Sequence, residues 1–520
     1  MSVRVNNIKL SPDLDESAVY ERALAKLRCK TSDVMSFRIV RQSVDARKKQ
    51  VQLVYAAELV LKDETHLPDL PDIKRIEEEP EERLISRLTS RPVVVGTGPC
   101  GLFCALTLAR AGAPPLVLER GAEVDKRTER VTQYWQGGAL DENSNVQFGE
   151  GGAGTFSDGK LTTRIHDGRA QKVLQEFHRF GAHEDILIKA KPHIGTDVLR
   201  QVVKNLRLEL IRLGCEFQFE TVLTDIDIKN GALCGITTSK EEYIPCEKLI
   251  LAIGHSARDT YEMLQRRGIY MEQKPFSVGV RIEHLQEEID RAMYGSFAGH
   301  PRLGAAEYQL SLRQGADACY SFCMCPGGTV VAAASEAETI VTNGMSRRAR
   351  DEKNANAALC VNVEGRHFGS AHPLAGVMFQ RELERRAFLL AKGAAPVQSV
   401  GSFLNGRSGS GFGKVEPSYT GKTAFCDLHK LFPDRVTTML ANGLHSFGTK
   451  IEGFSAPYAL LTGPETRTSA PVRITRGENG ESISLSGLYP AGEGAGYAGG
   501  IMSAAVDGIR IAQKILQQEV

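Results

Sequence analysis

Three glycines at G-x-G-x-x-G spacing, Gly96, Gly98 and Gly101, are the residues whose types and spacing point most directly to a chemistry. The first glycine allows a tight turn, the second lets backbone approach a pyrophosphate, and the third lets a helix pack closely on a strand. Pro99 suits the first turn of a helix, whose free N–H groups bind phosphate. Glu119, about 20 residues further on, is placed to bind ribose hydroxyls. The pattern predicts a dinucleotide site, with an ordinary strand–turn–helix unit as the alternative.

The elements that would position these residues follow in the expected order. Val93–Val95 predicts a buried parallel strand, and an apolar helical run ends near Gly112. Leu116–Leu118 predicts a second strand that ends at the acidic residue. The order strand, turn, helix, strand and acid supports the dinucleotide interpretation.

A second glycine-dense stretch, residues 137–161, contains Gly149, Gly151, Gly152 and Gly154 and shows little apolar periodicity. Irregular backbone this rich in glycine often lies close to a ligand. Because the stretch comes one connection after the predicted ribose-binding acid, we expect it to contact the ligand. A surface loop is the alternative.

Glycines recur near the C-terminus, where a short predicted strand leads through Gly492, Glu493, Gly499 and Gly500 to a helix that begins near Ile501. A nicotinamide-only fold has little need of a second glycine-rich helix start. A flavin does, because a helix N-terminus near its ring stabilises the anion formed on reduction. The two glycine-rich stretches together favour FAD over NAD.

Composition limits the classes of function. The 520 residues are 42% hydrophobic and 24% charged, as in an ordinary globular protein. The formal net charge of +1 gives no general attraction to nucleic acid or to an anionic membrane, and no apolar run has the length of a membrane span. Eleven scattered cysteines suggest reduced thiols, and the first residues lack the apolar core of a secretory signal. We expect a cytoplasmic protein with a small-molecule substrate.

The chain divides into segments with different patterns. Residues 1–70 predict a small N-terminal α+β module of ferredoxin-like type, in the order β-α-β-β, and residues 71–90 predict a linker. The dinucleotide-binding domain would comprise residues 91–270 and 481–520. Between them, residues 271–480 show strands and helices without a second fingerprint, and these predict an inserted substrate domain.

Five segments along the chain together resemble one family; they are GTGPCGLFCAL, GEGGAGTFSDGKL, LAIGHSARDT, FCMCPGG and YPAGEGAGYAGGI. They resemble the largely uncharacterised FAD-dependent dehydrogenase family, related to the glutathione-reductase-type flavoproteins. The resemblance covers nearly the whole chain. It implies an α/β fold with a Rossmann-like, GR2-type FAD-binding domain, an inserted α+β substrate domain and the small N-terminal module. Ile253 stands where the commoner form has proline.

The cofactor contacts are therefore assigned to the glycine-rich stretches and to predicted strand ends. The flavin ring would lie between the loop after Gly149 and the loop before Ile501. Lys160 is placed near the flavin, with a surface lysine as the alternative. The predicted cofactor-binding residues are Gly96, Gly98, Pro99, Gly101, Glu119, Arg120, Gly151, Gly152, Gly154, Ser157, Lys160, Val222, Gly254, Gly492, Glu493, Gly499, Gly500 and Ile501.

Three cysteines, Cys319, Cys323 and Cys325, have even spacings and would share one face of a strand. No fourth ligand at a common metal-site spacing accompanies them, so no metal is predicted. Small buried residues are the favoured interpretation, although Cys325 beside a turn could reach a substrate. No cysteine lies between Gly121 and Gly214, which disfavours the mechanism of the redox-disulfide flavoenzymes.

His255 and Arg258 follow a predicted strand end, where ligands gather in open α/β sheets. Either could bind substrate or a cofactor phosphate, and a structural role is the alternative. With FAD as the redox group, we expect an oxidoreductase that transfers hydride between flavin N5 and a small organic substrate, with NAD(P)H as a transient donor. The sequence assigns no catalytic acid or base.

Two other functions remain as alternatives. One is an FAD-dependent RNA-modifying enzyme, in which the basic turn at residues 47–49 of the N-terminal module touches RNA. The near-zero net charge disfavours nucleic acid, and a solvated hairpin tip is the favoured interpretation of that turn. The other is a non-catalytic FAD-binding protein.

Overall fold

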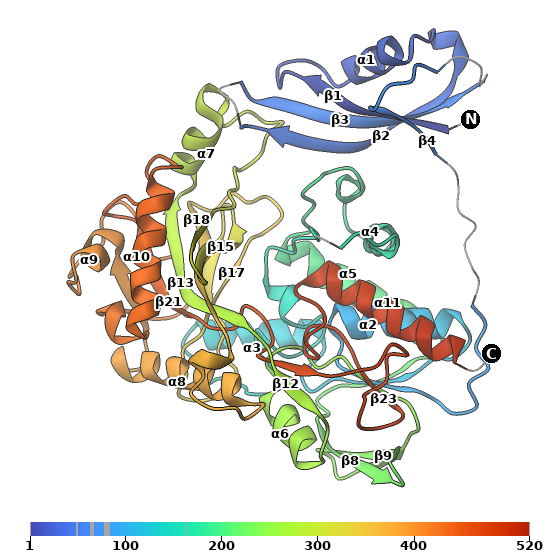
Figure 1. Cartoon of the computed structure of the whole chain (residues 1–520), viewed down its shortest axis with the longest axis vertical. Helices are drawn as coiled ribbons and strands as arrows, with labels where there is room; N and C mark the ends of the chain where they lie inside the picture. The colour runs from blue at the N-terminus through green and yellow to red at the C-terminus, as the bar shows by residue number, and fades with distance from the viewer. Residues whose placement is uncertain (1, 48–49, 63–66, 77–83, 164, 519–520) are drawn as a thin grey trace.

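The computed structural model describes residues 2–47, 50–62, 67–76, 84–163 and 165–518. The chain has a mixed α/β architecture in which a small N-terminal sheet lies above a parallel sheet and a larger mixed sheet (Figure 1). Strands far apart in the sequence meet in the parallel sheet, whose last member comes from near the C-terminus.

The N-terminal sheet has the strand order β2-β3-β1-β4, with neighbouring strands antiparallel and α1 packed on it. Its elements are β1 (Ser2–Leu10), α1 (Ala18–Leu27), β2 (Val34–Asp45), β3 (Gln52–Leu61) and β4 (Ile73–Ile76). The last strand lies inside the predicted linker and pairs with β1, so this part of the linker belongs to the N-terminal sheet. The described residues between β3 and β4 contain no second helix.

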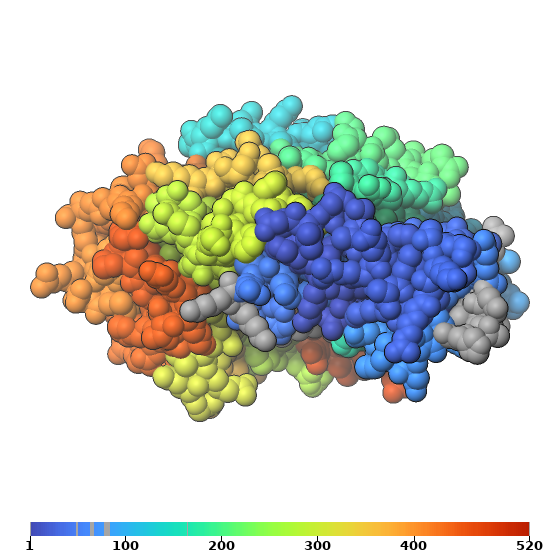
Figure 2. All heavy atoms as spheres, turned by 90° about the horizontal axis from the view of Figure 1, so that it is seen from above, coloured from blue at the N-terminus to red at the C-terminus, as the bar shows by residue number. Residues whose placement is uncertain are grey.

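The hairpin that joins β2 to β3 is docked on the rest of the molecule. Val51 is 4% exposed and lies in the core of the mixed sheet, and Ala46 packs against the same core. Arg47 pairs with Asp45, while positions 48 and 49 lie outside the described residues. Arg47 itself is exposed, as a solvated tip requires, so the packed residues are the flanking Ala46 and Val51. Figure 2 shows the N-terminal module beside the segment that follows β13.

The parallel sheet consists of three-residue strands. Four of them are buried on both faces, as parallel strands usually are, whereas the edge strand at residues 216–218 is partly exposed. Val94 faces a core shared with α2, α5 and α11, whereas Val93 and Val95 face a core shared with α6 and the β8–β10 sheet. In sheet order the strands are β23 (Leu488–Pro490), β11 (Leu249–Leu251), β5 (Val93–Val95), β6 (Leu116–Leu118) and β7 (Glu216–Gln218).

The mixed sheet forms the opposite wall of the molecule, and α8 and α10 cover its outer face (Figure 1). Its strands in order are β14 (Ser311–Gln314), β15 (Asp317–Cys325), β18 (Asn354–Val363), β13 (Phe276–Leu285), β21 (Leu460–Glu465), β19 (Ala395–Ser399) and β20 (Thr423–Phe425).

Small sheets and helices complete the fold. The remaining strands are β8 (Leu223–Lys229), β9 (Ala232–Thr238), β10 (Tyr243–Pro245), β12 (Met271–Gln273), β16 (Thr329–Ala332), β17 (Thr342–Met345) and β22 (Val472–Ile474). The helices are α2 (Pro99–Arg110), α3 (Val124–Trp135), α4 (Arg169–Arg179), α5 (Thr196–Arg212), α6 (Arg258–Arg266), α7 (Gln286–Tyr294), α8 (Ala375–Leu390), α9 (Val400–Leu404), α10 (Asp434–Gly448) and α11 (Ile501–Gln517).

Candidate functional site

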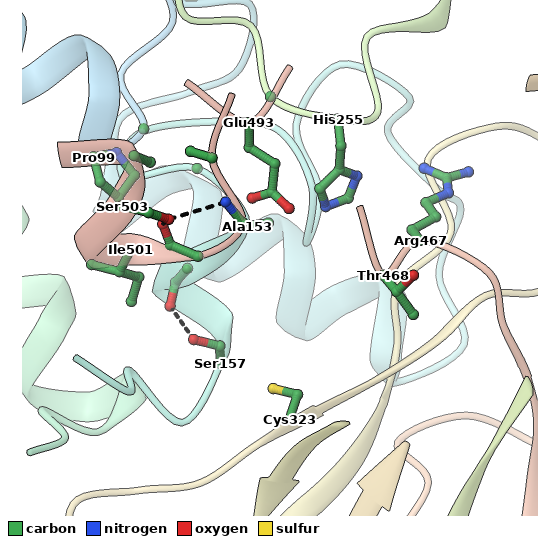
Figure 3. A pocket seen from close by; sticks show the side chains of 18 of the residues that line it. Pro99, Ala153, Ser157, His255, Cys323, Arg467, Thr468, Glu493, Ile501 and Ser503 are labelled. Carbon is green, nitrogen blue, oxygen red and sulfur yellow. Dashed lines mark hydrogen bonds between the residues drawn. The ribbon is translucent and has the colours of Figure 1, made fainter. Parts of the chain in front are cut away.

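A cavity of about 1570 Å³ lies between the carboxyl ends of the parallel strands and the mixed sheet. Its lining comes from the ends of β5, β6 and β11, from the glycine-rich loop after α3, from the loop before α11, and from β15 opposite. Figure 3 shows side chains from four separate segments around the pocket, namely Ser157, His255, Cys323 and Glu493. Ligands of open α/β sheets bind at this end of the strands.

The three glycines after β5 shape the cavity floor in different ways. Gly96 has a φ of +103°, and a Cβ there would lie 2.3 Å from the carbonyl oxygen of Ala252. A Cβ on Gly101 would lie 1.8 Å from the carbonyl oxygen of Gly96, so α2 reaches this turn only because no side chain intervenes. At Gly98 the nearest atom to a Cβ is the Cα of Gly152, at 3.9 Å. Backbone therefore faces the cavity openly at Gly98.

The Glu119 carboxylate ties three segments together beneath this turn. Its Oε2 accepts hydrogen bonds from the Thr97 amide at 2.9 Å and the Thr97 hydroxyl at 2.6 Å. Its Oε1 accepts from the amides of Gly121 at 2.9 Å and Gly149 at 3.0 Å. A carboxylate has about four lone-pair sites, and these four bonds occupy them. Glu119, which is 5% exposed, thus positions both glycine-rich stretches at the cavity edge.

Arg127 holds the glycine-rich loop from inside, although no motif marks it in the sequence. Its side chain is completely buried, and burial lowers its pKa to about 9, which leaves it protonated at neutral pH. The guanidinium donates to the backbone carbonyls of the loop, at 2.9 Å to Asn145, 3.0 Å to Val146, 2.6 Å to Glu150 and 2.9 Å to Gly152. One buried cation therefore sets the path of an otherwise irregular segment.

Most of the predicted cofactor residues line the cavity; they are Gly96, Gly98, Pro99, Glu119, Arg120, Gly152, Gly154, Ser157, Lys160, Gly254, Glu493, Gly499, Gly500 and Ile501. Gly101, Gly151 and Gly492 lie behind it and allow close packing. A Cβ on Gly151 would lie 2.1 Å from Thr155 Oγ1, and one on Gly492 would lie 2.8 Å from Cys100 Cβ.

Val222 does not line the cavity, which corrects its assignment as a cofactor contact. Its N–H donates to the Ser239 hydroxyl at 3.0 Å, and its carbonyl accepts from the Ser239 amide at 2.8 Å. Thr221 and Leu223 line the cavity instead. Since successive residues of extended backbone face opposite sides, the prediction was wrong by one position.

Arg258 is also absent from the cavity wall, so its prediction as a substrate residue is wrong. Its side chain is 1% exposed and donates twice to Glu384, each time at 2.8 Å, and also to Glu336. Arg467 shares this carboxylate at 3.0 Å and does line the cavity. The buried Glu384 thus fixes one structural arginine, Arg258, and one arginine that faces the cavity, Arg467.

His255 lines the cavity next to this arginine. Its Nδ1 lies 2.9 Å from the hydroxyl of Ser256, which also accepts a hydrogen bond from Arg467 at 3.1 Å. Burial, followed by the nearby charges of Arg467 and Arg258, lowers the pKa of His255 to about 3. The imidazole is therefore neutral at neutral pH.

Glu493 faces the same part of the pocket (Figure 3). Burial raises the pKa of its carboxyl group to about 7, although the neighbouring Lys274 acts in the opposite direction. Lys274 itself donates to the Ser469 hydroxyl at 2.7 Å. The charge of Glu493 therefore changes near neutral pH.

Lys160 connects the glycine-rich loop to the opposite wall. Its ammonium group donates to Asp158 at 2.8 Å and to the carbonyl oxygen of Met324 in β15. Arg350 donates to both oxygens of the same Asp158. Lys160 is therefore a paired cation in the cavity lining rather than a surface lysine.

The three cysteines of β15 do not share a face, which corrects another expectation. The register of β15 against β18 shifts between Phe322 and Cys325, and Cys323 has a φ of +44°. This bulge adds a residue and turns the following side chains. Cys319 and Cys325 are fully buried, and Cys325 does not line the cavity. Cys323 is the cysteine of this strand that does.

Two further searches covered the described part of the chain. There, no group of three or more His, Cys, Asp and Glu side chains is arranged to hold a metal ion. The same residues contain no helix with the length and apolar character needed to cross a membrane.

Comparisons with known proteins connect the chain to other sequences. A family model described as "FAD-dependent protein, C-terminal domain-like" matches residues 275–468, and a domain of unknown function matches residues 2–60. An uncharacterized protein of Clostridium beijerinckii is 48% identical to this chain, and the alignment covers 100% of this chain and 99% of that protein.

Among solved structures, a flavin-dependent brominase is 11% identical, with a TM-score of 0.37 and coverage of 82% of this chain and 78% of the brominase. A geranylgeranyl bacteriochlorophyll reductase-like protein from Thermoplasma acidophilum is 14% identical, with a TM-score of 0.36 and coverage of 82% and 79%. Likeness at this level is no argument for a shared activity. The end-to-end match with the Clostridium protein and the domain match over residues 275–468 are stronger, and by them the chain belongs to the family of FAD-dependent proteins that share this C-terminal domain.

Proposed function

We propose that the cavity holds FAD and that the protein is an FAD-dependent oxidoreductase acting on a small organic molecule. The observation that carries this proposal is that α2 and α11, from opposite ends of the domain sequence, both begin at the cavity. Helix N-termini attract negative charge. One such end suits a pyrophosphate, and a second suits the negative charge that a flavin ring gains on reduction.

The shape of the lining supports FAD as the ligand. Backbone without a side chain faces open space at Gly254, Gly499 and Gly500, where a Cβ would meet nothing within 4 Å. The cavity volume of about 1570 Å³ exceeds the roughly 300–1,000 Å³ of an ordinary ligand pocket. This leaves room for a large cofactor and a substrate together. The parallel strand order β7-β6-β5-β11-β23 supports the Rossmann-like, GR2-type description of this domain.

Bound FAD would supply a two-electron carrier, and the chain's own residues would bind, orient and exclude water. The pyrophosphate would lie at the Gly98 turn, with Glu119 and Arg127 holding the surrounding backbone. On the substrate side, Arg467 offers a fixed positive charge and His255 a neutral imidazole. Glu493, with a pKa of about 7, can take up or release a proton at its carboxylate. An anionic or strongly polar substrate suits this wall.

The test is FAD binding by the native protein and by a Gly98→Val variant. A valine side chain at position 98 would start from the open side of the turn, where the nearest atom to its Cβ is the Gly152 Cα at 3.9 Å. We expect native protein to carry flavin absorbance, and the variant to lose at least about tenfold in FAD affinity, or about 1.4 kcal/mol. Its thermal midpoint without FAD should change little.

Gly168→Val is the matched control, because position 168 lies outside the cavity lining and a Cβ there meets nothing within 4 Å. It should bind FAD as the native protein does. Native protein that neither contains nor binds FAD would overturn the proposal. Loss of the flavin colour on anaerobic addition of NADH, NADPH or small hydroxy and amino acids would separate an oxidoreductase from a non-catalytic FAD-binding protein.

A further inference from the structure

We propose that Cys323 and Cys325 form a thiol–disulfide pair that exchanges with small disulfides entering the cavity. Cys323 is the attacking thiol and Cys325 the resolving thiol. The inference uses the cavity wall formed by β15 and does not depend on bound FAD. It adds a redox site to the protein beyond the proposed flavin function.

The two thiols differ in access in the way that such a pair requires. Cys323 lines the cavity, is half-buried, and its sulfur points into the pocket (Figure 3). Cys325 is fully buried behind it, and its thiol donates to the Cys323 carbonyl oxygen at 3.4 Å. An incoming disulfide can therefore reach Cys323 directly. Cys325 can react only with a mixed disulfide that has already formed on Cys323.

The two cysteines are within reach of a disulfide because they are two residues apart. Even in a fully extended strand, residues two apart are separated by about 6.6 Å, which lies inside the roughly 4.4–6.8 Å between Cα atoms that disulfides adopt. A left-handed φ of +44° at Cys323 bends the strand at this point. Arg281, which is fully buried, holds the bend by donating to the Cys323 carbonyl oxygen at 2.8 Å.

Positive charge around the pair favours the reactive thiolate. The neighbouring Cys325 side chain, followed by the charges of Arg281 and Lys160, lowers the pKa of Cys323 below its usual range. The same interaction, together with burial, raises the pKa of Cys325. Lys160 also donates to the carbonyl oxygen of Met324, between the two cysteines. A thiolate in such surroundings is the attacking species of thiol–disulfide exchange.

The exchange balances in two steps. The Cys323 thiolate attacks one sulfur of the substrate disulfide, which forms a mixed disulfide and releases the first substrate thiolate. Cys325 then gives up its proton, and its sulfur displaces the second substrate thiolate from Cys323. The protein dithiol has become a disulfide, and the substrate disulfide has gained two electrons and two protons as two thiols.

The experiment treats the reduced full-length protein with bis(2-hydroxyethyl) disulfide and follows intact mass and peptide maps. Native protein should lose two hydrogen atoms in mass and form the Cys323–Cys325 disulfide. Cys325→Ser should stop at a mixed disulfide on Cys323, and Cys323→Ser should form neither product at the native rate. Cys234→Ser, which removes a half-buried thiol outside the cavity, should behave as the native protein does.

Peptide mapping of native protein at early times needs no variant and keeps the test independent of variant folding. A first adduct on Cys29 or Cys234, or a mixed disulfide on Cys323 that persists in the native protein, would overturn the proposal. From about pH 8 to pH 6, the reaction of an ordinary thiol slows about tenfold per unit, whereas that of Cys323 should change much less. The same outcomes are expected with and without bound FAD, so failure of FAD binding leaves this result unaffected.

Discussion

At the scale of single residues, the cavity depends on buried arginines that hold other groups in place. Arg127 satisfies several loop carbonyls at once, and Arg467 and Arg258 share Glu384. Because buried charges without partners are costly, each of these groups stabilises the site through its neighbours. They determine where the backbone and the cavity-facing charges lie.

Arg127→Ala is expected to lower stability strongly. The substitution leaves several buried carbonyl groups without donors, and each unsatisfied group costs about 1–3 kcal/mol. We expect a loss of about 3 kcal/mol or more, measured as a shift of the urea midpoint, together with loss of FAD binding. Arg130→Ala on the same helix removes half-exposed ion pairs to Asp141 and Glu220 and should cost under about 1 kcal/mol. Equal shifts for the two variants would contradict this role of Arg127.

Glu493 gives a pH dependence with a defined sign. Its folded-state pKa of about 7 lies above the ordinary value of 4.5, so the folded protein holds this proton more tightly than the unfolded chain does. The resulting stabilisation is complete below about pH 4.5 and is lost as the pH rises toward 7. The thermal midpoint of Glu493→Gln minus that of native protein should therefore rise from about pH 5 to 7 and then level off.

The control for this measurement is Glu452→Gln, because Glu452 is exposed to solvent and lies outside the cavity lining. Its midpoint difference from the native protein should stay constant over the same range. A constant difference for Glu493→Gln as well would show that Glu493 does not titrate with a raised pKa.

Local patterns in the sequence located the glycine turn and the two other glycine-rich stretches. A tight turn or a close backbone approach requires glycine at particular positions, and these positions can be recognised from neighbouring residues in the chain. The contacts of Arg127 join segments about 20 residues away that have no periodic pattern, so nothing local marks this arginine. Arg258 follows a strand end and Cys325 lies beside a turn, as the sequence predicts. Neither side chain lines the cavity, however. Which side a side chain takes at a helix start or after a bulge depends on partners distant in sequence.

At the scale of elements, the close crossing of α2 and α11 joins the two helices that begin at the cavity. Gly508 in α11 lies against the backbone of α2, and a Cβ there would be 2.1 Å from the Cys100 carbonyl oxygen. The Asp507 side chain accepts a hydrogen bond from the Gly492 amide at 2.8 Å and pairs with Arg476. Asp507 therefore links the position of α11 to that of the loop before it.

Gly508→Ala should be destabilising, contrary to the usual effect of this substitution in a helix. At an unhindered helical position, alanine stabilises by roughly 0.5–1 kcal/mol relative to glycine. Here the methyl group forces the helices apart, and we expect a loss of about 1–3 kcal/mol in thermal unfolding. FAD affinity should also fall, since both helix N-termini move. Gly168→Ala, in open space, is the control, and a raised midpoint for Gly508→Ala would contradict the close crossing.

At the scale of the whole molecule, the N-terminal module contacts segments that border the cavity. The Gln42 amide donates to the Ile188 carbonyl at 2.8 Å, and the Ala190 amide donates to the Gln42 carbonyl at 2.8 Å. The next residue, Lys191, lines the cavity and pairs with Glu307. The N-terminal sheet therefore supports part of the cavity wall.

Arg302→Ala should loosen this support. Arg302 donates to the carbonyl oxygens of Pro12 and Leu14 and to the Tyr55 hydroxyl at 2.7 Å. Without these bonds, we expect faster hydrogen–deuterium exchange at residues 188–190 and in β2. Arg291→Ala, which removes exposed contacts with Glu287 in the same helix, should leave the exchange there unchanged. Unaltered exchange in Arg302→Ala would show that the module is held by other contacts.

The place of β23 in the parallel sheet has a consequence for synthesis of the chain on the ribosome. The strand pairs with β11, yet it is made only after the whole mixed sheet. Until then, one edge of β11 has no partner, and the loop and helix that close the cavity do not exist. The nascent chain can fold its N-terminal module early, since domains generally fold as they emerge. If the cavity holds FAD as proposed, its complete binding site forms only after α11 has left the ribosome.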